Sequence, residues 1–475
     1  MNLPTPTRAI PIPDEVNHYG LRKQSLSPLE TLAQSISSVA PTAGPTVLIS
    51  LVFASAGNGT WLSYVLATVA LFFVALNVST FASHSASPGS LYAYSTSVLR
   101  GPVGELSAWA LLLAYIATAS AVIGGFVSYV SLLLLSAWRI QAPPVLLALV
   151  GCGLATYLAF RDVKISARLM LWFEALSVSL ISFVMVITLV RSGLHWDAQQ
   201  FTLKGATFTG VRTGLILAIF SFVGFESATT LGGEAKNPLR TIPRAVILTA
   251  ILAGLFFTVC AYAEVLGFRE AHENLATADA PLQVLADRGH MSYLGPLIDI
   301  GAITSFFACA LSCITAAARV ALSMSHKGLA PKRLRRVHHR NETPGVAVLV
   351  TGAASFVAPA LLFANRATGF DVNGWMGSLA TYGFISAYLL VSIAMPLHLH
   401  KHGRLTPGSS IVSGIAALFM ILAFAGSIYP WPAAPYSWLL ILFLAYLCCG
   451  FLYSVAAART AARANSLASS ETSRL

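Results

Sequence analysis

Residues 37–45 read Ser-Ser-Val-Ala-Pro-Thr-Ala-Gly-Pro and lie in the middle of a long apolar run. The two prolines lack the amide donor that a helix needs, and the glycine loosens the backbone, so a continuous helix is not expected here. A second apolar run carries Phe-Ser-Phe-Val-Gly-Phe-Glu-Ser at residues 220–227. Its carboxyl, Glu226, is costly in a membrane unless it lines a cavity or has a partner. The two stretches predict two interrupted helices.

The composition places the whole chain in a membrane. Of 475 residues, 56% are hydrophobic and 10% are charged, which is too apolar for a soluble core to cover. At roughly 20 residues per crossing, the chain has room for about twelve helices and no soluble domain. We predict an all-α polytopic membrane protein. Its segments are expected at 29–55, 60–82, 103–135, 143–160, 167–190, 212–233, 242–267, 294–325, 345–363, 373–395, 410–428 and 435–457.

The distribution of charge predicts the orientation. The N-terminal tail, 1–28, is polar and contains no apolar stretch of signal-peptide length, so we expect it in the cytoplasm. Most Lys and Arg residues, including the basic run within 327–340, then lie in cytoplasmic loops of a cell-membrane protein. The C-terminal tail, 458–475, returns to the cytoplasm, and its composition predicts disorder. The net charge of +11 faces anionic lipid, so no nucleic acid partner is expected.

The spacing of the two interruptions indicates a function. They fall in the first and sixth segments, five helices apart, as in transporters built from inverted repeats, where substrate binds between two unwound stretches. The N-terminus of a half-helix attracts a carboxylate, and freed carbonyls accept hydrogen bonds from an ammonium group. A zwitterion therefore fits such a site. A simple proline kink is the alternative for the first break, and the matching second break argues against it.

Longer motifs surround the second break, and others lie elsewhere along the chain. They are Phe222–Ser227, Gly233–Pro238, Thr241–Ala245, Ser87–Tyr94, Ala318–Arg319 and His326–Pro331. Together they resemble the signature of the amino acid–polyamine–organocation transporters. The resemblance implies secondary active transport and a leucine-transporter-like fold, with inverted repeats at 29–190 and 212–395 and two further helices within 410–457.

The resemblance also implies backbone contacts with the substrate on both breaks. A substrate carboxylate would meet the amides of Thr42, Ala43 and Gly44. An ammonium group would meet the carbonyls of Val39, Phe220 and Val223. The candidates for a pocket wall or gate are Phe225 and either Phe306 or Phe307. This chain departs from the family at the first break, where Pro41 and Pro45 flank a stretch that is usually Gly-small-Gly. The carboxylate contacts can therefore differ by a residue.

Two acidic residues are candidates for ion coupling. Glu226 either takes up and releases a proton during transport or braces the unwound segment. Glu174 is either a second proton site or the partner of Arg168, and we favour that pairing. No lysine occurs in the fifth segment, so the mechanism that uses one there in some family members is absent. Sodium coupling stays open, because hydroxyls such as those of Ser312 and Thr315 can coordinate it.

Charged residues near the cytoplasmic ends have simpler interpretations. Arg319 lies near the cytoplasmic end of the eighth segment and is predicted to form a structural or gating ion pair rather than to bind substrate. Glu234, Lys236 and Arg240 either form salt bridges that open and close or are solvated surface charges. We favour solvated charge, because exposed ion pairs contribute little.

These observations predict a secondary active transporter that moves an amino acid across the cell membrane by alternating access, coupled to protons. No HExxH, GxSxG or P-loop motif is present, so an enzyme or an ATP-driven pump is not indicated. Filter residues typical of channels are also missing. We expect no metal and no cofactor. The open alternatives are sodium coupling, amino acid exchange, and transport of a polyamine or an amino alcohol such as ethanolamine.

Overall fold

The computed structural model describes residues 19–99, 101–193, 196–278, 280–429 and 431–472. Every regular element within these ranges is helical, which confirms the all-α fold class. The α-helices are α1 (Pro28–Val39), α2 (Ile49–Ala56), α3 (Thr60–Ala82), α4 (Leu91–Thr96), α5 (Pro102–Trp138), α6 (Pro144–Arg161), α7 (Val163–Arg191), α8 (Ala198–Phe201), α9 (Phe208–Phe220), α10 (Pro238–Gly267), α11 (Pro281–Arg288), α12 (Gly295–His326), α13 (Gly345–Ala364), α14 (Gly369–Lys401), α15 (Pro407–Ile428) and α16 (Tyr436–Thr472). The shorter turns used below are η2 (Gly44–Leu48) and η4 (Ser227–Leu231).

The described helices account for twelve crossings. Ten stretches are long and apolar enough to span a membrane, and the first of them, Pro28–Ala82, is 55 residues long and contains both α1–α2 and α3. The sixth segment is the shorter apolar helix α9. Most helix bounds lie within a few residues of the predicted segments. Leu146, Leu418 and Leu442 are about half exposed on α6, α15 and α16, as expected of faces that contact lipid.

Both predicted interruptions are present. After α1, Ala40 adopts a left-handed conformation with φ 50°, and the chain resumes as the π-helical turn η2. The sixth segment stops at the end of α9 and continues only as the 3-10 turn η4, with Gly224 at φ 91° between them. The helix expected over 212–233 is therefore interrupted within the predicted stretch, because Gly224 adopts a positive φ that ends the helical twist.

Close helix contacts form the core around the breaks. α5 packs against α12 and α14, and glycines let the backbones approach. A Cβ on Gly383 would lie 2.6 Å from the Ala110 carbonyl oxygen, and one on Gly124 would lie 2.6 Å from the Gly369 carbonyl oxygen. Small residues at helix contacts are typical of membrane proteins, where close packing replaces the hydrophobic effect as the source of stability. α5, α12 and α14 thus form a tightly packed unit beside the broken helices.

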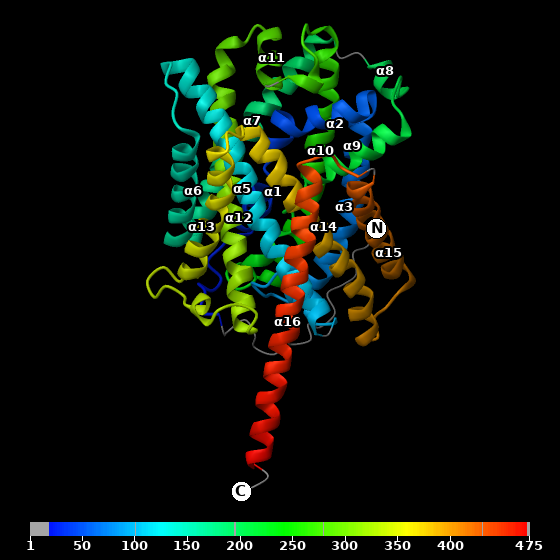
Figure 1. Cartoon of the computed structure of the whole chain (residues 1–475). Helices are drawn as coiled ribbons and strands as arrows, with labels where there is room; N and C mark the ends of the chain where they lie inside the picture. The colour runs from blue at the N-terminus through cyan, green and yellow to red at the C-terminus, as the bar shows by residue number, and fades with distance from the viewer. Residues whose placement is uncertain (1–18, 100, 194–195, 279, 430, 473–475) are drawn as a thin grey trace.

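The two ends of the bundle are closed differently. Figure 1 shows α8 and α11 at one end and the free end of α16 projecting from the other. Near the predicted cytoplasmic end, residues 19–27 run beside the loop that follows η4. The amides of Ser25 and Leu26 donate to the Glu234 carbonyl at 2.8 and 3.0 Å, and the Lys236 amide donates to the Leu26 carbonyl at 2.9 Å. The N-terminal segment therefore ties down the inner end of the sixth segment.

The C-terminal tail differs from the prediction of disorder. α16 continues to Thr472 and extends beyond the bundle (Figure 1). Alanine and arginine favour helices, and lengthening an existing helix avoids the cost of nucleation. Of the two predicted tails, residues 1–18 and 473–475 lie outside the described residues.

Candidate substrate site

The two interrupted helices contact each other. Gly224 faces the backbone of Ser38, and a Cβ on Gly224 would lie 3.0 Å from the Ser38 carbonyl oxygen. Ser227 Oγ donates to the Gln34 carbonyl at 3.0 Å, which links η4 to α1. Ser312 Oγ on α12 donates to the same carbonyl at 2.8 Å. Both unwound stretches therefore border one region beside α12.

The first break leaves backbone donors free. Among the described residues, the amides of Thr42 and Gly44 donate no hydrogen bond, whereas the Ala43 amide donates to the Ala40 carbonyl at 2.8 Å. Free amides at the start of a helix bind anionic groups. Two of the three amides singled out from the sequence are thus available to a carboxylate, and the third is occupied.

Carbonyls at the breaks are also free. Within the described part of the chain, the carbonyls of Val39 and Val223 accept no hydrogen bond, and the Phe220 carbonyl accepts only a long one of 3.4 Å from the Val223 amide. Unwound carbonyls of this kind coordinate cations in transporters with broken helices. Val39 and Val223 are 5% and 3% exposed, and Phe220 is partly buried, so a ligand here would be shielded from water.

Aromatic side chains surround the place where the breaks meet. The rings of Phe222 and Phe257 lie 5.2 Å apart and nearly perpendicular, and Tyr64 contacts both rings. Gly44 lies against the same cluster, since a Cβ there would be 2.5 Å from Phe257 Cε1. All three aromatic residues are fully buried. The wall beside the first break is therefore apolar and aromatic.

The other side chains singled out from the sequence divide between this region and the helix interfaces. Phe225 packs on a tyrosine ring of α14, and Phe306 packs on a tyrosine ring of α5. Phe307 contacts phenylalanine rings of α5 and α7 instead. Phe220 lies against a glycine of α14. The Val39 side chain lines a groove of about 400 Å³ toward α7 and α10, so only its carbonyl is available to the breaks.

Two phenols hold Glu226. Tyr115 Oη donates to Glu226 Oε1 at 2.7 Å, and Tyr388 Oη donates to Oε2 at 2.5 Å. Tyr388 Oη in turn accepts the Gly224 amide at 3.1 Å. All of these groups are buried. The carboxyl thus ties the unwound part of the sixth segment to α5 and α14, which is the geometry of a brace.

Glu174 does not pair with Arg168, so the favoured pairing is wrong. Glu174 Oε2 accepts a hydrogen bond from Ser305 Oγ at 2.9 Å, and Arg168 Nε lies 3.0 Å from Glu30 Oε1. Glu30 lies in the first turn of α1, and Arg168 lies in the second turn of α7. Glu174 lies six residues further along α7, roughly 9 Å from Arg168 along the helix axis. The Arg168 side chain therefore pairs with Glu30 and does not reach Glu174.

Glu234 is not a solvated surface charge, contrary to the favoured interpretation. Its carboxylate forms a bidentate pair with Arg319, with Nε–Oε2 and Nη2–Oε1 distances of 2.6 Å. The Arg319 side chain is 1% exposed and that of Glu234 is 0% exposed. The expected ion pair of Arg319 is therefore present, but it is buried rather than near the surface.

Sequence reasoning missed three buried polar residues. Tyr115 and Tyr388 hold Glu226, and nothing in their sequence context separates them from other membrane tyrosines. Glu264 on α10 is fully buried, and neither of its carboxylate oxygens has a hydrogen-bond partner among the described residues. The signal that singled out Glu226, an acid within an apolar run, applies equally to Glu264.

Among the residues that the structure describes, no three His, Cys, Asp or Glu side chains are placed to hold a metal ion.

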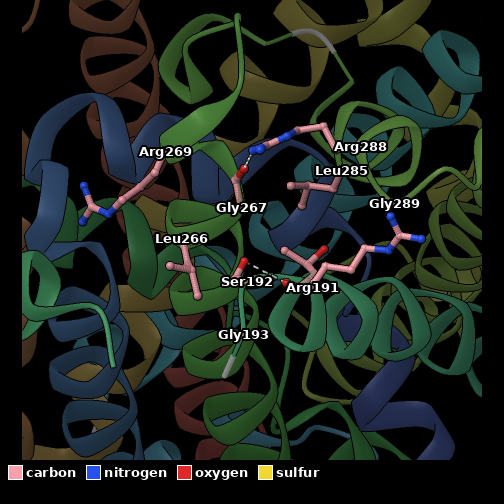
Figure 2. A pocket seen from close by; sticks show the side chains of 10 residues that line it. Arg191, Ser192, Gly193, Leu266, Gly267, Arg269, Leu285, Arg288 and Gly289 are labelled. Carbon is pink, nitrogen blue, oxygen red and sulfur yellow. Dashed lines mark hydrogen bonds between the residues drawn. The ribbon is translucent and has the colours of Figure 1, made fainter. Parts of the chain in front are cut away.

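A separate pocket of about 380 Å³ lies where the ends of α7, α10 and α11 meet (Figure 2). Arg191, Arg269 and Arg288 line it, and Arg288 donates a hydrogen bond to the Gly267 carbonyl at the end of α10. Arg269 Nε lies 2.6 Å from Asp197 Oδ2. Burial raises the pKa of Asp197, but the Arg269 guanidinium outweighs it and holds that pKa below its usual range. The pocket is basic and borders the last turn of α10.

Comparisons with known proteins agree with this geometry. The family model described as amino acid permease matches residues 31–462. The branched-chain amino acid permease BcaP of Bacillus subtilis is 28% identical over 91% of this chain and 93% of its own length. Cationic amino acid transporter 4 of Mus musculus is 26% identical over 71% of this chain and 54% of its own length.

A solved structure shows the same fold. MhsT in complex with L-phenylalanine superposes with a TM-score of 0.60 over 85% of this chain and 99% of its own, at 15% identity. The expected leucine-transporter-like fold of two inverted five-helix repeats and two further helices is thereby confirmed. The residue bounds of the repeats, 29–190 and 212–395, stay predictions. Because the family model matches most of this chain, residues 31–462, this multi-pass membrane protein belongs to the amino acid permease family and is an amino acid transporter.

Proposed function

We propose that the protein takes up an amino acid with an apolar side chain across the cell membrane, driven by the proton gradient, with both termini in the cytoplasm. The observation that carries this proposal is the meeting of the two breaks, with free amides at Thr42 and Gly44 and free carbonyls at Val39 and Val223. Donors and acceptors placed together in a buried region suit the carboxylate and the ammonium group of one zwitterion.

The side-chain preference follows from the walls. Tyr64, Phe222 and Phe257 offer apolar rings, and the nearby acid, Glu226, has both oxygens occupied by phenols. Glu226 therefore has no free oxygen for a cationic side chain, and burying an unpaired charge is costly. The relatives include proteins named for branched-chain and for cationic amino acids, and this geometry favours the former.

The driving force is an ion gradient, because no nucleotide-binding motif is present. The membrane-embedded acids supply protonatable groups for it, and alternating access around a fixed site moves the substrate. The sequence indicates Glu226 and Glu174 as candidates for coupling transport to protons. The brace geometry of Glu226 leaves room for a further acid in that role.

A thermal-shift screen of the purified protein tests the substrate class. L-amino acids with branched or aromatic apolar side chains are expected to raise the melting temperature, since a ligand at 100 times its Kd stabilises the folded state by about 2.7 kcal/mol. The corresponding amines, which lack the carboxylate, are expected to give no shift. A shift by polyamines or ethanolamine, with none by amino acids, would contradict the proposal and demote the Thr42 and Gly44 amides.

A further inference from the structure

Glu264 has no compensating partner in the membrane. Its side chain is 0% exposed, and among the described residues no donor or cation reaches either carboxylate oxygen. A carboxylate charge without water, hydrogen bonds or a counter-ion is strongly disfavoured in such a place. Burial without partners therefore favours the neutral, protonated form of the side chain in this conformation.

The other membrane acids differ from Glu264. Glu226 accepts two phenol hydrogen bonds, and Glu174 accepts one from Ser305. Asp299 on α12 accepts one from Gln283 at 2.7 Å. Each of these three carboxyls has at least one hydrogen-bond donor, whereas Glu264 has none among the described residues. Because Glu264 has no such donor, its carboxylate must contact water whenever its proton leaves or arrives.

Two tyrosines connect Glu264 to the breaks. The Tyr64 phenol interacts electrostatically with Glu264, and its Oη lies 3.1 Å from Ser221 Oγ in the second break. The Tyr129 phenol also interacts with Glu264, and it contacts the Thr46 hydroxyl in η2, beside the first break. Each tyrosine therefore lies near Glu264 and also contacts a residue of one unwound stretch.

Along α10, Glu264 lies close to the arginine pocket, although it does not line that pocket. Gly267, one turn further on, lines the arginine pocket of Figure 2. Phe257, seven residues earlier and roughly 10 Å along the helix, packs against Gly44 and Phe222 at the meeting of the breaks. Glu264 thus stands between an outer pocket and the substrate region.

The titratable groups around Glu264 are few. Tyr64 faces it from α3, Tyr129 from α5, and Cys260 lies one turn away on α10 itself. Three arginines line the pocket at this end of α10: Arg288 binds the Gly267 carbonyl, Arg269 binds Asp197, and neither these two nor Arg191 pairs with Glu264. Nothing in this set holds a charge on the carboxylate while the region is closed.

We propose that Glu264 carries the coupling proton: it takes the proton from water at the outer pocket, keeps it while both breaks are buried, and releases it to water on the other side. This proposal rests on proton-driven transport as proposed above. The proton bonds to a Glu264 oxygen on loading and returns to water on release, so no other reactant is required. Glu226 keeps its role as a brace.

The experiment compares Glu264→Gln with Glu226→Gln and with Glu273→Gln, an exposed acid in the loop after α10. Each variant is reconstituted in vesicles, and two transport modes are measured with the amino acid that the thermal screen identifies. Counterflow of labelled for unlabelled substrate reports binding and movement. Accumulation under an imposed pH difference reports coupling. We expect Glu264→Gln to keep counterflow and to lose accumulation, while Glu273→Gln keeps both.

Infrared spectroscopy gives an independent readout of the proton. The wild-type protein is expected to show a carboxylic acid carbonyl band that disappears in Glu264→Gln and persists in Glu273→Gln. The proposal is overturned if this band is unchanged, if Glu264→Gln accumulates like the wild type, or if it loses counterflow as well. It is also overturned if Glu226→Gln alone uncouples transport. If the wild-type protein moves amino acids without using the pH difference, proton-driven transport itself fails, which a wild-type measurement alone reveals.

Discussion

Arg319→Met is expected to destabilise the protein by about 3–5 kcal/mol, because it leaves the Glu234 carboxylate buried without its partner. Both side chains are almost fully shielded, and the pair is bidentate. Arg319 also donates to the Thr315 carbonyl at 2.9 Å, so the substitution removes that contact too. The melting temperature in detergent, followed by size-exclusion chromatography after heating, measures the loss.

Two further variants separate the ion pair from a general effect of removing a cation. Arg240→Met removes an exposed arginine on α10 and is expected to change stability by no more than about 0.5 kcal/mol. The double variant Arg319→Met with Glu234→Leu replaces the pair by apolar side chains, which is often neutral. Its stability is expected to return toward the wild type, since residues 19–27 bind the Glu234 backbone rather than its side chain. A double variant as unstable as Arg319→Met would contradict the role of the unpaired charge.

The sequence was sufficient for the helices because their ends are marked locally. Proline at the first turns of α5, α6, α10 and α15 and glycine after several helices limit the apolar runs, and these signals act within a few residues. The breaks were predictable for the same reason, since missing amide donors interrupt a helix wherever it packs. The helical tail of α16 could not be predicted in this way, because its composition suits both a disordered segment and the continuation of a helix.

The site was less accessible to prediction because its partners come from different helices. Which acid pairs with Arg168 depends on the depth at which α1 and α7 cross, and the order of residues along the chain does not contain that depth. The burial of Glu234 depends on the loop after η4 folding back over α12. Glu264, in contrast, was within reach of the reasoning that selected Glu226, and only its lack of any partner required the structure.

Gly44→Leu is expected to abolish saturable substrate binding while leaving the protein in the membrane. Even a Cβ at this position would lie 2.5 Å from Phe257 Cε1, so a leucine side chain must displace the ring that forms the wall of the region, and the Gly44 amide would be shielded from a carboxylate. Binding of labelled amino acid to the purified variant measures the loss. Gly414→Leu is the matched control, because the space around Gly414 on α15 is open and binding should be unaffected.

Adding Phe257→Ala to Gly44→Leu distinguishes a packing defect from a defect of the site. Removing the ring gives the leucine room, and the double variant is expected to recover thermal stability, because overpacking in a filled core is relieved when the neighbour is made smaller. Binding is expected to stay absent, since the leucine still covers the free amide and the aromatic wall is gone. Unchanged affinity in Gly44→Leu would show that substrate binds elsewhere. Full recovery of binding in the double variant would show that Gly44 matters only as a space for Phe257, and the carboxylate would then have to be held by the Thr42 amide alone.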